Sequence, residues 1–128
     1  TRGTTDSNLA FATLEAIAFS VQAVLSAMEQ DLGKPLTALK VDGGAAANDL
    51  LLQIQADCSK TEVVRAKNLE STGFGAALLA GLGVGIFTSI SELQQLNPAQ
   101  ARFQPQHDRG AEYSRWLKAI EVTRGFQN

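Results

Sequence analysis

Two short apolar runs with a helical segment between them constrain the fold of this chain most strongly. Residues 36–41 and 62–65 have the length of strands, and residues 46–59 between them carry apolar side chains at helical spacing. Strands that are separated by a helix pair in parallel through a right-handed crossover. The sequence therefore predicts an α/β fold with a short parallel sheet, in the order helix, strand, helix, strand, helices.

Helical patterns flank this central unit on both sides. Residues 7–32 carry an apolar stripe at spacings of three and four, with Asp6 or Ser7 as the expected N-cap and with Gly33 and Pro35 as the end signal. The remaining predicted elements are a third helix over residues 72–87, a short helix over 92–96 capped by Ser91, a loop over 101–109 and a last helix over 110–124 that packs through Tyr113 and Trp116. The small residues of the third helix favour close packing on a neighbouring helix.

The length and the strand count together predict a piece of a longer protein. The 128 residues are enough for one domain with a core, but two strands are few for a sheet that usually has about five or six. The chain also begins at Thr1 without an initiator methionine and without the pattern of a signal peptide. We therefore expect that residues 1–128 form a single domain that belongs to a larger chain.

Charge and reactive side chains exclude several classes of function. The net charge of −2 gives no electrostatic signal for nucleic-acid binding, and the apolar stretch 74–87 is too short to span a bilayer. Cys58 is the only cysteine and His107 the only histidine, so neither a disulfide, nor a zinc site, nor a nucleophile–base pair is expected. We expect His107 to lie in a solvated loop, and we predict neither a catalytic nor a metal-binding residue in this chain.

The turn after the first predicted strand is the best candidate for a binding site. It contains Gly43 and Gly44, whose missing Cβ atoms let a ligand approach the backbone, and Asn48 in the first turn of the expected helix. A helix that begins near Ala46 would present free N–H groups to an anion. Ligands of open α/β sheets bind at the carboxyl ends of the strands, where this turn lies. The two glycines also fit a tight strand-to-helix turn that binds nothing.

Five segments of the chain carry a family resemblance, and they are residues 1–4, 8–19, 41–57, 75–85 and 103–119. In this order they resemble the C-terminal domain of the FGGY carbohydrate kinases, and the glycerol kinase branch of that family most. The chain departs from the family pattern at Ser59 and Lys60, where a Leu-Gly pair is usual, and at Phe74, where a smaller aliphatic residue is common.

The resemblance implies a partial actin-like, ribonuclease H-like ATPase domain, in which ATP lies in a cleft between two lobes. Residues 1–128 would be the C-terminal part of the second, nucleotide-side domain. Gly44 and Asn48 match nucleotide-contacting positions of the family, with Gly43 supporting the turn. The catalytic base and the polyol-binding residues would lie outside this chain.

The activity implied by the resemblance is phosphoryl transfer from ATP to glycerol, with Mg²⁺ as cofactor and glycerol 3-phosphate as product. The expected partners are ATP or ADP, the polyol, the rest of the kinase chain and, in some arrangements, further copies of the enzyme; the expected location is the cytoplasm, and the isolated chain is expected to be inactive. Two alternatives stay open at this point. One is another FGGY sugar kinase, such as a xylulokinase or gluconokinase, and the other is a non-catalytic dimerisation module built on an actin-like half-domain.

Overall fold

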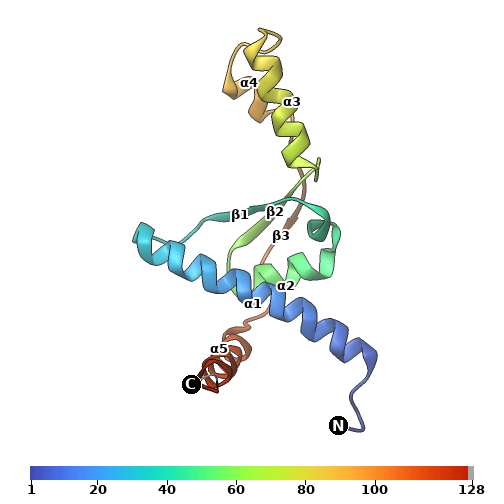
Figure 1. The fold of residues 1–128 in the computed structure, drawn as a ribbon, viewed down its shortest axis with the longest axis vertical. Helices are drawn as coiled ribbons and strands as arrows, with labels where there is room; N and C mark the ends of the chain where they lie inside the picture. Colours follow the sequence, from blue (N-terminus) through green and yellow to red (C-terminus); the bar gives the residue numbers. More distant parts are fainter. Residues whose placement is uncertain (127–128) are drawn as a thin grey trace.

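The computed structural model describes residues 1–126 and arranges them around a small mixed sheet (Figure 1). α1 and α2 lie on the same side of the sheet, while α3 and α4 extend away from it at the end opposite to α5. The elements in chain order are α1 (Asp6–Leu32), β1 (Ala38–Val41), the 3₁₀ helix η1 (Gly44–Ala47), α2 (Asp49–Ser59), β2 (Glu62–Ala66), α3 (Ser71–Gly83), α4 (Ile90–Gln94), β3 (Ala99–Phe103) and α5 (Gly110–Gly125).

The predicted parallel pair of strands is confirmed, but the sheet has a third strand that the sequence did not predict. β1 pairs in parallel with β2, with Leu39 opposite Val63. β3 then pairs antiparallel with β2 on its other edge, with Phe103 opposite Val63. The prediction of a loop over residues 101–109 is therefore wrong for its first part. Hydrogen bonds with β2, rather than local strand propensity, make this segment a strand.

The N-terminal helix α1 begins one residue earlier than predicted, because Thr5 rather than Asp6 or Ser7 is its N-cap. Thr5 and Asn8 form a reciprocal capping box, in which the Asn8 side chain accepts a hydrogen bond of 2.9 Å from the Thr5 amide. Gly33 ends the helix in the left-handed conformation, with φ of 65°. The predicted end of this helix is confirmed.

α1 is long and apolar enough to cross a membrane by length and composition, with a mean hydropathy of 1.6 over its most apolar 18 residues. The sequence expectation concerned only residues 74–87 and did not consider this longer apolar segment. The core helix of a soluble protein can have the same composition. In this structure α1 packs on α2 through Ala18 and Phe19, which are both buried.

Two small cores lie on opposite faces of α2. One contains Phe19 of α1 and Ile54 of α2, with Tyr113 and Trp116 of α5 packed against them. The ring centroids of Phe19 and Trp116 lie 5.9 Å apart, so the predicted packing role of the α5 aromatics is confirmed. The other core lies between α2 and the sheet and is formed by Ala46, Leu52, Ala56 and Val63.

Of the helices after β2, α3 is shorter than predicted, α4 begins two residues earlier than predicted, and α5 lies where it was predicted. α3 ends at Gly83, where the chain turns back so that the amide of Ile86 donates to the carbonyl oxygen of Gly81 at 2.8 Å. α4 is capped by Ser89 rather than Ser91. The predicted close packing of α3 on a neighbouring helix is not confirmed. Gly81 is covered by the ring of Phe87, which follows α3 in the chain, and a side chain at the other glycines of this helix would meet no atom of the described residues within 4 Å.

Candidate functional site

The turn after β1 requires glycine at its first position. Gly43 has φ of 83° and ψ of 170°, a conformation that residues with a Cβ rarely adopt. Its amide donates a hydrogen bond of 2.9 Å to the carbonyl oxygen of Leu69, in the loop after β2. Gly44 faces open space, since a Cβ at this position would meet nothing within 4 Å. The chain therefore exposes its backbone at Gly44 and fixes it at Gly43.

The helix after this turn begins later than predicted. Residues Gly44–Ala47 form a single 3₁₀ turn, and α2 begins only at Asp49. Asn48 separates the two because it adopts an extended conformation and caps α2, with its Oδ1 accepting from the amide of Leu51 at 3.1 Å. The predicted helix start near Ala46 is therefore wrong, and Asn48 is an N-cap rather than a residue of the first turn. Asn48 is exposed.

Arg65, at the end of β2, contacts the far end of the turn. Its Nη1 lies 3.1 Å from the carbonyl oxygen of Ala46 and 2.5 Å from Oδ1 of Asp49. This residue was not predicted from the sequence, because no local pattern indicates that a strand residue contacts a turn 18 positions earlier. The only available signal was its place at the carboxyl end of a predicted strand.

A groove of about 260 Å³ with several polar side chains in its lining lies at the carboxyl ends of the two parallel strands. Asp42 and Lys40 line it from the β1 side, and Ser71 and Asn97 line it from the segments after β2. Asn97 fixes the loop after β2 through two hydrogen bonds with the backbone of Asn68, of 2.8 and 3.2 Å. The structure thus brings the Gly43 turn and the loop after β2 together at one edge of the sheet, as ligand sites of α/β sheets require.

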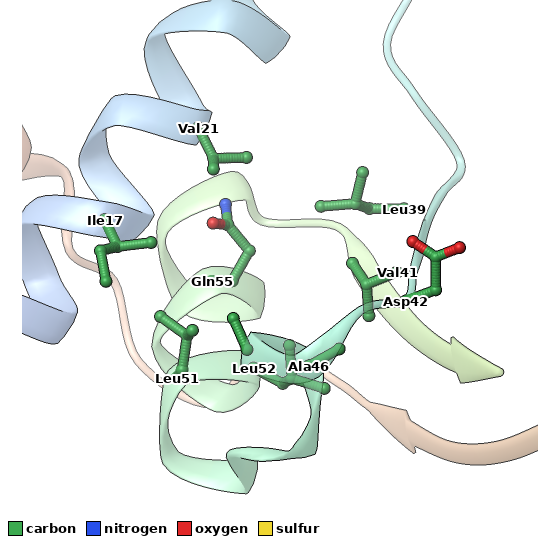
Figure 2. Close-up of a pocket in the computed structure, with 10 residues that line it drawn as sticks. Ile17, Val21, Leu39, Val41, Asp42, Ala46, Leu51, Leu52 and Gln55 are labelled. Atoms are coloured by element: carbon green, nitrogen blue, oxygen red, sulfur yellow. The ribbon is translucent and has the colours of Figure 1, made fainter. Parts of the chain in front are cut away.

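An apolar pocket of about 220 Å³ lies between α1, β1 and α2 (Figure 2). Ile17 and Val21 of α1 line one side, and Leu39 and Val41 of β1 line the other. Gln55 of α2 lies among them, and its Nε2 has no hydrogen-bond partner within residues 1–126. Asp42 is the single charged residue of the lining, so this pocket lacks the polar groups that would bind phosphate.

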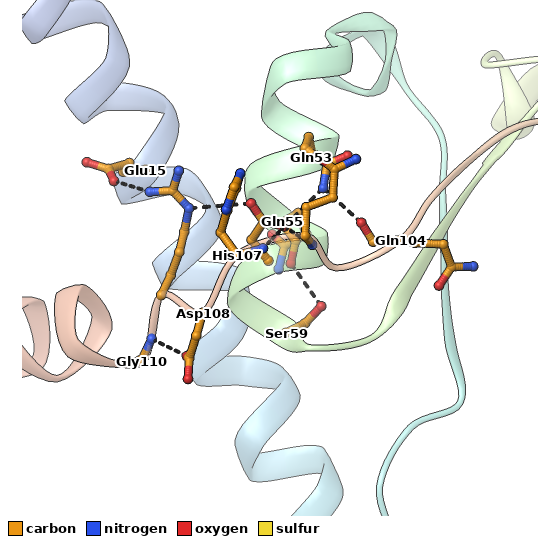
Figure 3. A network of polar contacts seen from close by, with 11 residues as sticks. Glu15, Gln53, Gln55, Ser59, Gln104, His107, Asp108 and Gly110 are labelled. Carbon is orange, nitrogen blue, oxygen red and sulfur yellow. Dashed lines mark hydrogen bonds and ion pairs between the residues drawn. The ribbon is translucent and has the colours of Figure 1, made fainter.

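A separate polar network holds the segment before α5 to the carboxyl-terminal half of α2 (Figure 3). Oδ1 of Asp57 accepts hydrogen bonds from the amides of Gln106 and His107 at 2.8 and 3.2 Å, and from Nε2 of Gln53 at 3.0 Å. Burial opposes the ionisation of Asp57, but these three donors outweigh it and hold the pKa of the carboxyl below its ordinary value. The side chain of His107 is exposed, as predicted, and only its backbone takes part in the network.

Arg109 connects the same network to α1. Its Nη1 donates to Oε1 of Glu15 at 2.6 Å, and its Nε lies 3.7 Å from Oδ2 of Asp57. Cys58 is buried next to this network, and burial raises the pKa of its thiol to about 11. These groups stabilise the packing of α1, α2 and α5. Residues 1–126 contain no group of three or more His, Cys, Asp or Glu side chains that could hold a metal ion.

Comparison with known families identifies the class of protein. Residues 1–84, more than half of the chain, match the C-terminal domain of the FGGY family of carbohydrate kinases. The chain belongs to this family. The predicted α/β class and the actin-like ATPase fold are thereby confirmed.

Curated relatives narrow the similarity to one branch of the family. The chain is 50% identical over 129 aligned positions to a glycerol kinase of Aromatoleum aromaticum, covering 98% of this chain and 26% of that protein. It is 42% identical to a glycerol kinase of Enterococcus faecalis, over 99% of this chain and 26% of that protein. The chain thus spans about a quarter of the length of these relatives.

Solved structures agree with the sequence relatives. The structure of Plasmodium falciparum glycerol kinase with ADP superimposes with a TM-score of 0.82 at 34% identity, covering 96% of this chain and 25% of that one. A xylulose kinase from Lactobacillus acidophilus has a TM-score of 0.70 at 24% identity, which shows a shared fold only.

Proposed function

We propose that this chain is the C-terminal, nucleotide-side part of an ATP-dependent glycerol kinase. The enzyme would transfer the terminal phosphoryl group of ATP to glycerol and release ADP and glycerol 3-phosphate. The observation that carries this proposal is the 50% identity to a glycerol kinase along nearly the whole chain. The similarity to a glycerol kinase structure that contains ADP supports the assignment of the nucleotide to this enzyme.

Within the chain, we propose that Gly43, Gly44 and Asn48 form the nucleotide-binding turn. Gly44 leaves its backbone open to a ligand, and the positive φ of Gly43 gives the turn its shape. Asn48 uses its Oδ1 to cap α2, so its Nδ2 is the group that would donate a hydrogen bond to the nucleotide. Contacts of this kind position ATP, and positioning is the main source of catalysis in phosphoryl transfer.

Mg²⁺ would reach this enzyme with the phosphates of ATP and neutralise their charge during transfer. The described residues do not fit a metal site of their own, because no cluster of carboxylates is present among residues 1–126. We therefore assign neither Mg²⁺ ligands nor the catalytic base to this chain, and we place the polyol-binding residues in the rest of the enzyme.

The rest of the kinase chain would be the main partner of this domain. Several large apolar side chains of α1 are exposed, among them Ile17, Val24 and Met28, and a partner segment would cover them. The charge balance offers no basic surface for nucleic acid. α1 packs on α2 in this structure, so we propose a cytoplasmic enzyme without a membrane partner. Further copies of the enzyme are the second candidate partner for the exposed apolar side chains.

The test is a coupled assay of ADP formation by the full-length protein that contains this chain. We expect ADP formation that depends on glycerol, and no activity from the isolated 128 residues. Activity with xylulose or gluconate but not glycerol would transfer the assignment to another FGGY kinase. A full-length protein that self-associates but forms no ADP with any polyol would contradict the kinase assignment and favour a dimerisation module.

A further inference from the structure

The guanidinium of Arg65 is bound to the part of the chain that forms the proposed nucleotide-binding turn. Nη1 donates to the carbonyl oxygen of Ala46 at 3.1 Å and to Oδ1 of Asp49 at 2.5 Å. The carbonyl oxygen of Ala47 lies further from Nη1, at 3.4 Å, and shares the two hydrogens of this nitrogen with the other acceptors. We infer that Arg65 is a positioning residue, which holds the Gly43–Asn48 turn in the shape that binds the nucleotide. This inference rests on the proposed function.

The Arg65 side chain is mostly buried, so its surroundings restrict the position of the guanidinium group. Only 12% of its side chain is exposed, whereas its partner Asp49 is 72% exposed. The guanidinium carbon lies 5.6 Å from the centre of the Phe103 ring on β3, a cation–π contact that further restrains the side chain. A buried cation is costly unless it is paired and hydrogen-bonded. Its partners here are the carbonyl oxygens and the carboxylate at the end of the turn.

The turn needs such a restraint because its own hydrogen bonds are few. A single 3₁₀ turn has poor hydrogen-bond geometry, and its last carbonyl groups have no partner inside the turn. Gly43 and Gly44 add conformational freedom in the absence of other contacts. The Gly43 amide is bound to Leu69 at one end, and the buried Ala46 methyl group packs in the core. Arg65 supplies the polar anchor at the other end.

A mobile turn would bind a nucleotide more weakly, because the ligand would have to order it. Gly44 and Asn48 flank the carbonyl groups that Arg65 holds, so the loss of Arg65 changes the position of both. The polyol site lies in the rest of the enzyme under the proposed function. The inference therefore predicts a defect in nucleotide binding that leaves the affinity for glycerol unchanged.

The variants that test this are Arg65→Gln and Arg65→Lys in the full-length enzyme, with Arg102→Gln as matched control. Arg102 lies on the neighbouring strand and pairs with Glu62 at 2.8 Å, but it makes no contact with the turn in the described structure. We expect Arg65→Gln to raise the KM for ATP by roughly tenfold, within the range known for displaced binding groups. We expect the KM for glycerol to stay within about twofold, since the polyol contacts are not touched. Arg65→Lys keeps a charged donor, so its KM for ATP should lie between those of Arg65→Gln and the parent enzyme.

Hydrogen exchange of the backbone amides of residues 43–48, measured without nucleotide, separates this inference from the proposed function. We expect faster exchange in Arg65→Gln than in the parent enzyme and in Arg102→Gln, and an intermediate rate in Arg65→Lys. Unchanged exchange in Arg65→Gln would overturn the inference whatever the substrate of the enzyme. Faster exchange with an unchanged KM for ATP would overturn the positioning role in nucleotide binding. If Arg65→Gln does not fold, the exchange rate of residues 43–48 and the KM for ATP are measured on Arg65→Lys instead, and the same outcomes apply. A parent enzyme without kinase activity would defeat the proposed function alone, because the exchange comparison needs no activity.

Discussion

The amide of Gly43 donates a 2.9 Å hydrogen bond to the carbonyl oxygen of Leu69, and this bond joins the turn after β1 to the loop after β2. The two segments follow parallel neighbouring strands, so their contact lies at the carboxyl edge of the sheet. Gly44 is exposed in this turn and Arg65 binds its other end. Under the proposed function, this turn is the backbone surface that the nucleotide reaches.

The conformation of Gly43 predicts different effects of alanine at the two neighbouring glycines. Gly43→Ala should lower the free energy of unfolding by about 1–3 kcal/mol, because φ of 83° with ψ of 170° strains any residue with a Cβ. Gly44→Ala should change it by less than about 0.5 kcal/mol, because the new methyl group meets no atom. Urea unfolding of the two variants measures the difference, and equal stability would contradict the role of Gly43 in shaping the turn.

The departure from the family at Lys60 predicts a stabilising substitution. Lys60 is the C-cap of α2 and has φ of 53°, a left-handed conformation that costs a non-glycine residue about 1 kcal/mol. Lys60→Gly should therefore raise the unfolding free energy by about 0.5–1 kcal/mol. The substitution also removes an exposed ion pair with Asp108, which contributes little. Lys60→Ala is the control, since it removes the ion pair and keeps the strain; a gain as large as that of glycine would refute the explanation.

Asp57 predicts a specific dependence of stability on pH. Its pKa is lowered in the folded protein, so the carboxylate adds stability above its unfolded pKa of about 3.9, and this stability disappears as the pH falls below that value. Asp57→Asn should cost about 1–3 kcal/mol at pH 7, and this cost should shrink as the pH falls through the lowered folded pKa of Asp57. Thermal unfolding of both proteins across this range gives the comparison. A difference that is independent of pH would show that the charge of Asp57 contributes nothing.

The buried thiol of Cys58 provides a probe of folding. Its pKa of about 11 and its position in the core between α1 and α2 predict that the folded protein does not react with a thiol reagent at pH 8. In denaturant, the single cysteine should react rapidly. Fast labelling of the folded protein would mean that α1 separates from α2 on the time scale of the reaction.

The sequence predicts the elements whose signals are local. The parallel strands, the end of α1 at Gly33 and the aromatic packing of α5 follow from short patterns, and the structure agrees with each. β3 could not be predicted in the same way, because its alternation consists largely of alanine and becomes a strand through pairing with β2.

In the candidate site, too, only the features with a local sequence signal could be predicted. The glycine turn was predicted from two adjacent residues after a strand, and the cap at Asn48 could have been predicted too, since asparagine is a favoured N-cap before an apolar helix. The contact between Arg65 and Asp49 depends on the register of β1 and β2 and on the 3₁₀ turn. No pattern within one segment contains that information.

The most direct test of the account measures ADP binding by calorimetry to the full-length protein with Gly44→Val. The control variant is Gly3→Val, at another glycine where a side chain meets no atom within 4 Å. A branched side chain at Gly44 would occupy the space through which the nucleotide approaches the backbone. The account predicts that Gly44→Val weakens ADP binding by roughly tenfold or more and leaves glycerol binding unchanged, with Gly3→Val like the parent protein. Equal ADP affinity in Gly44→Val and the parent would contradict the assignment of the nucleotide to this turn.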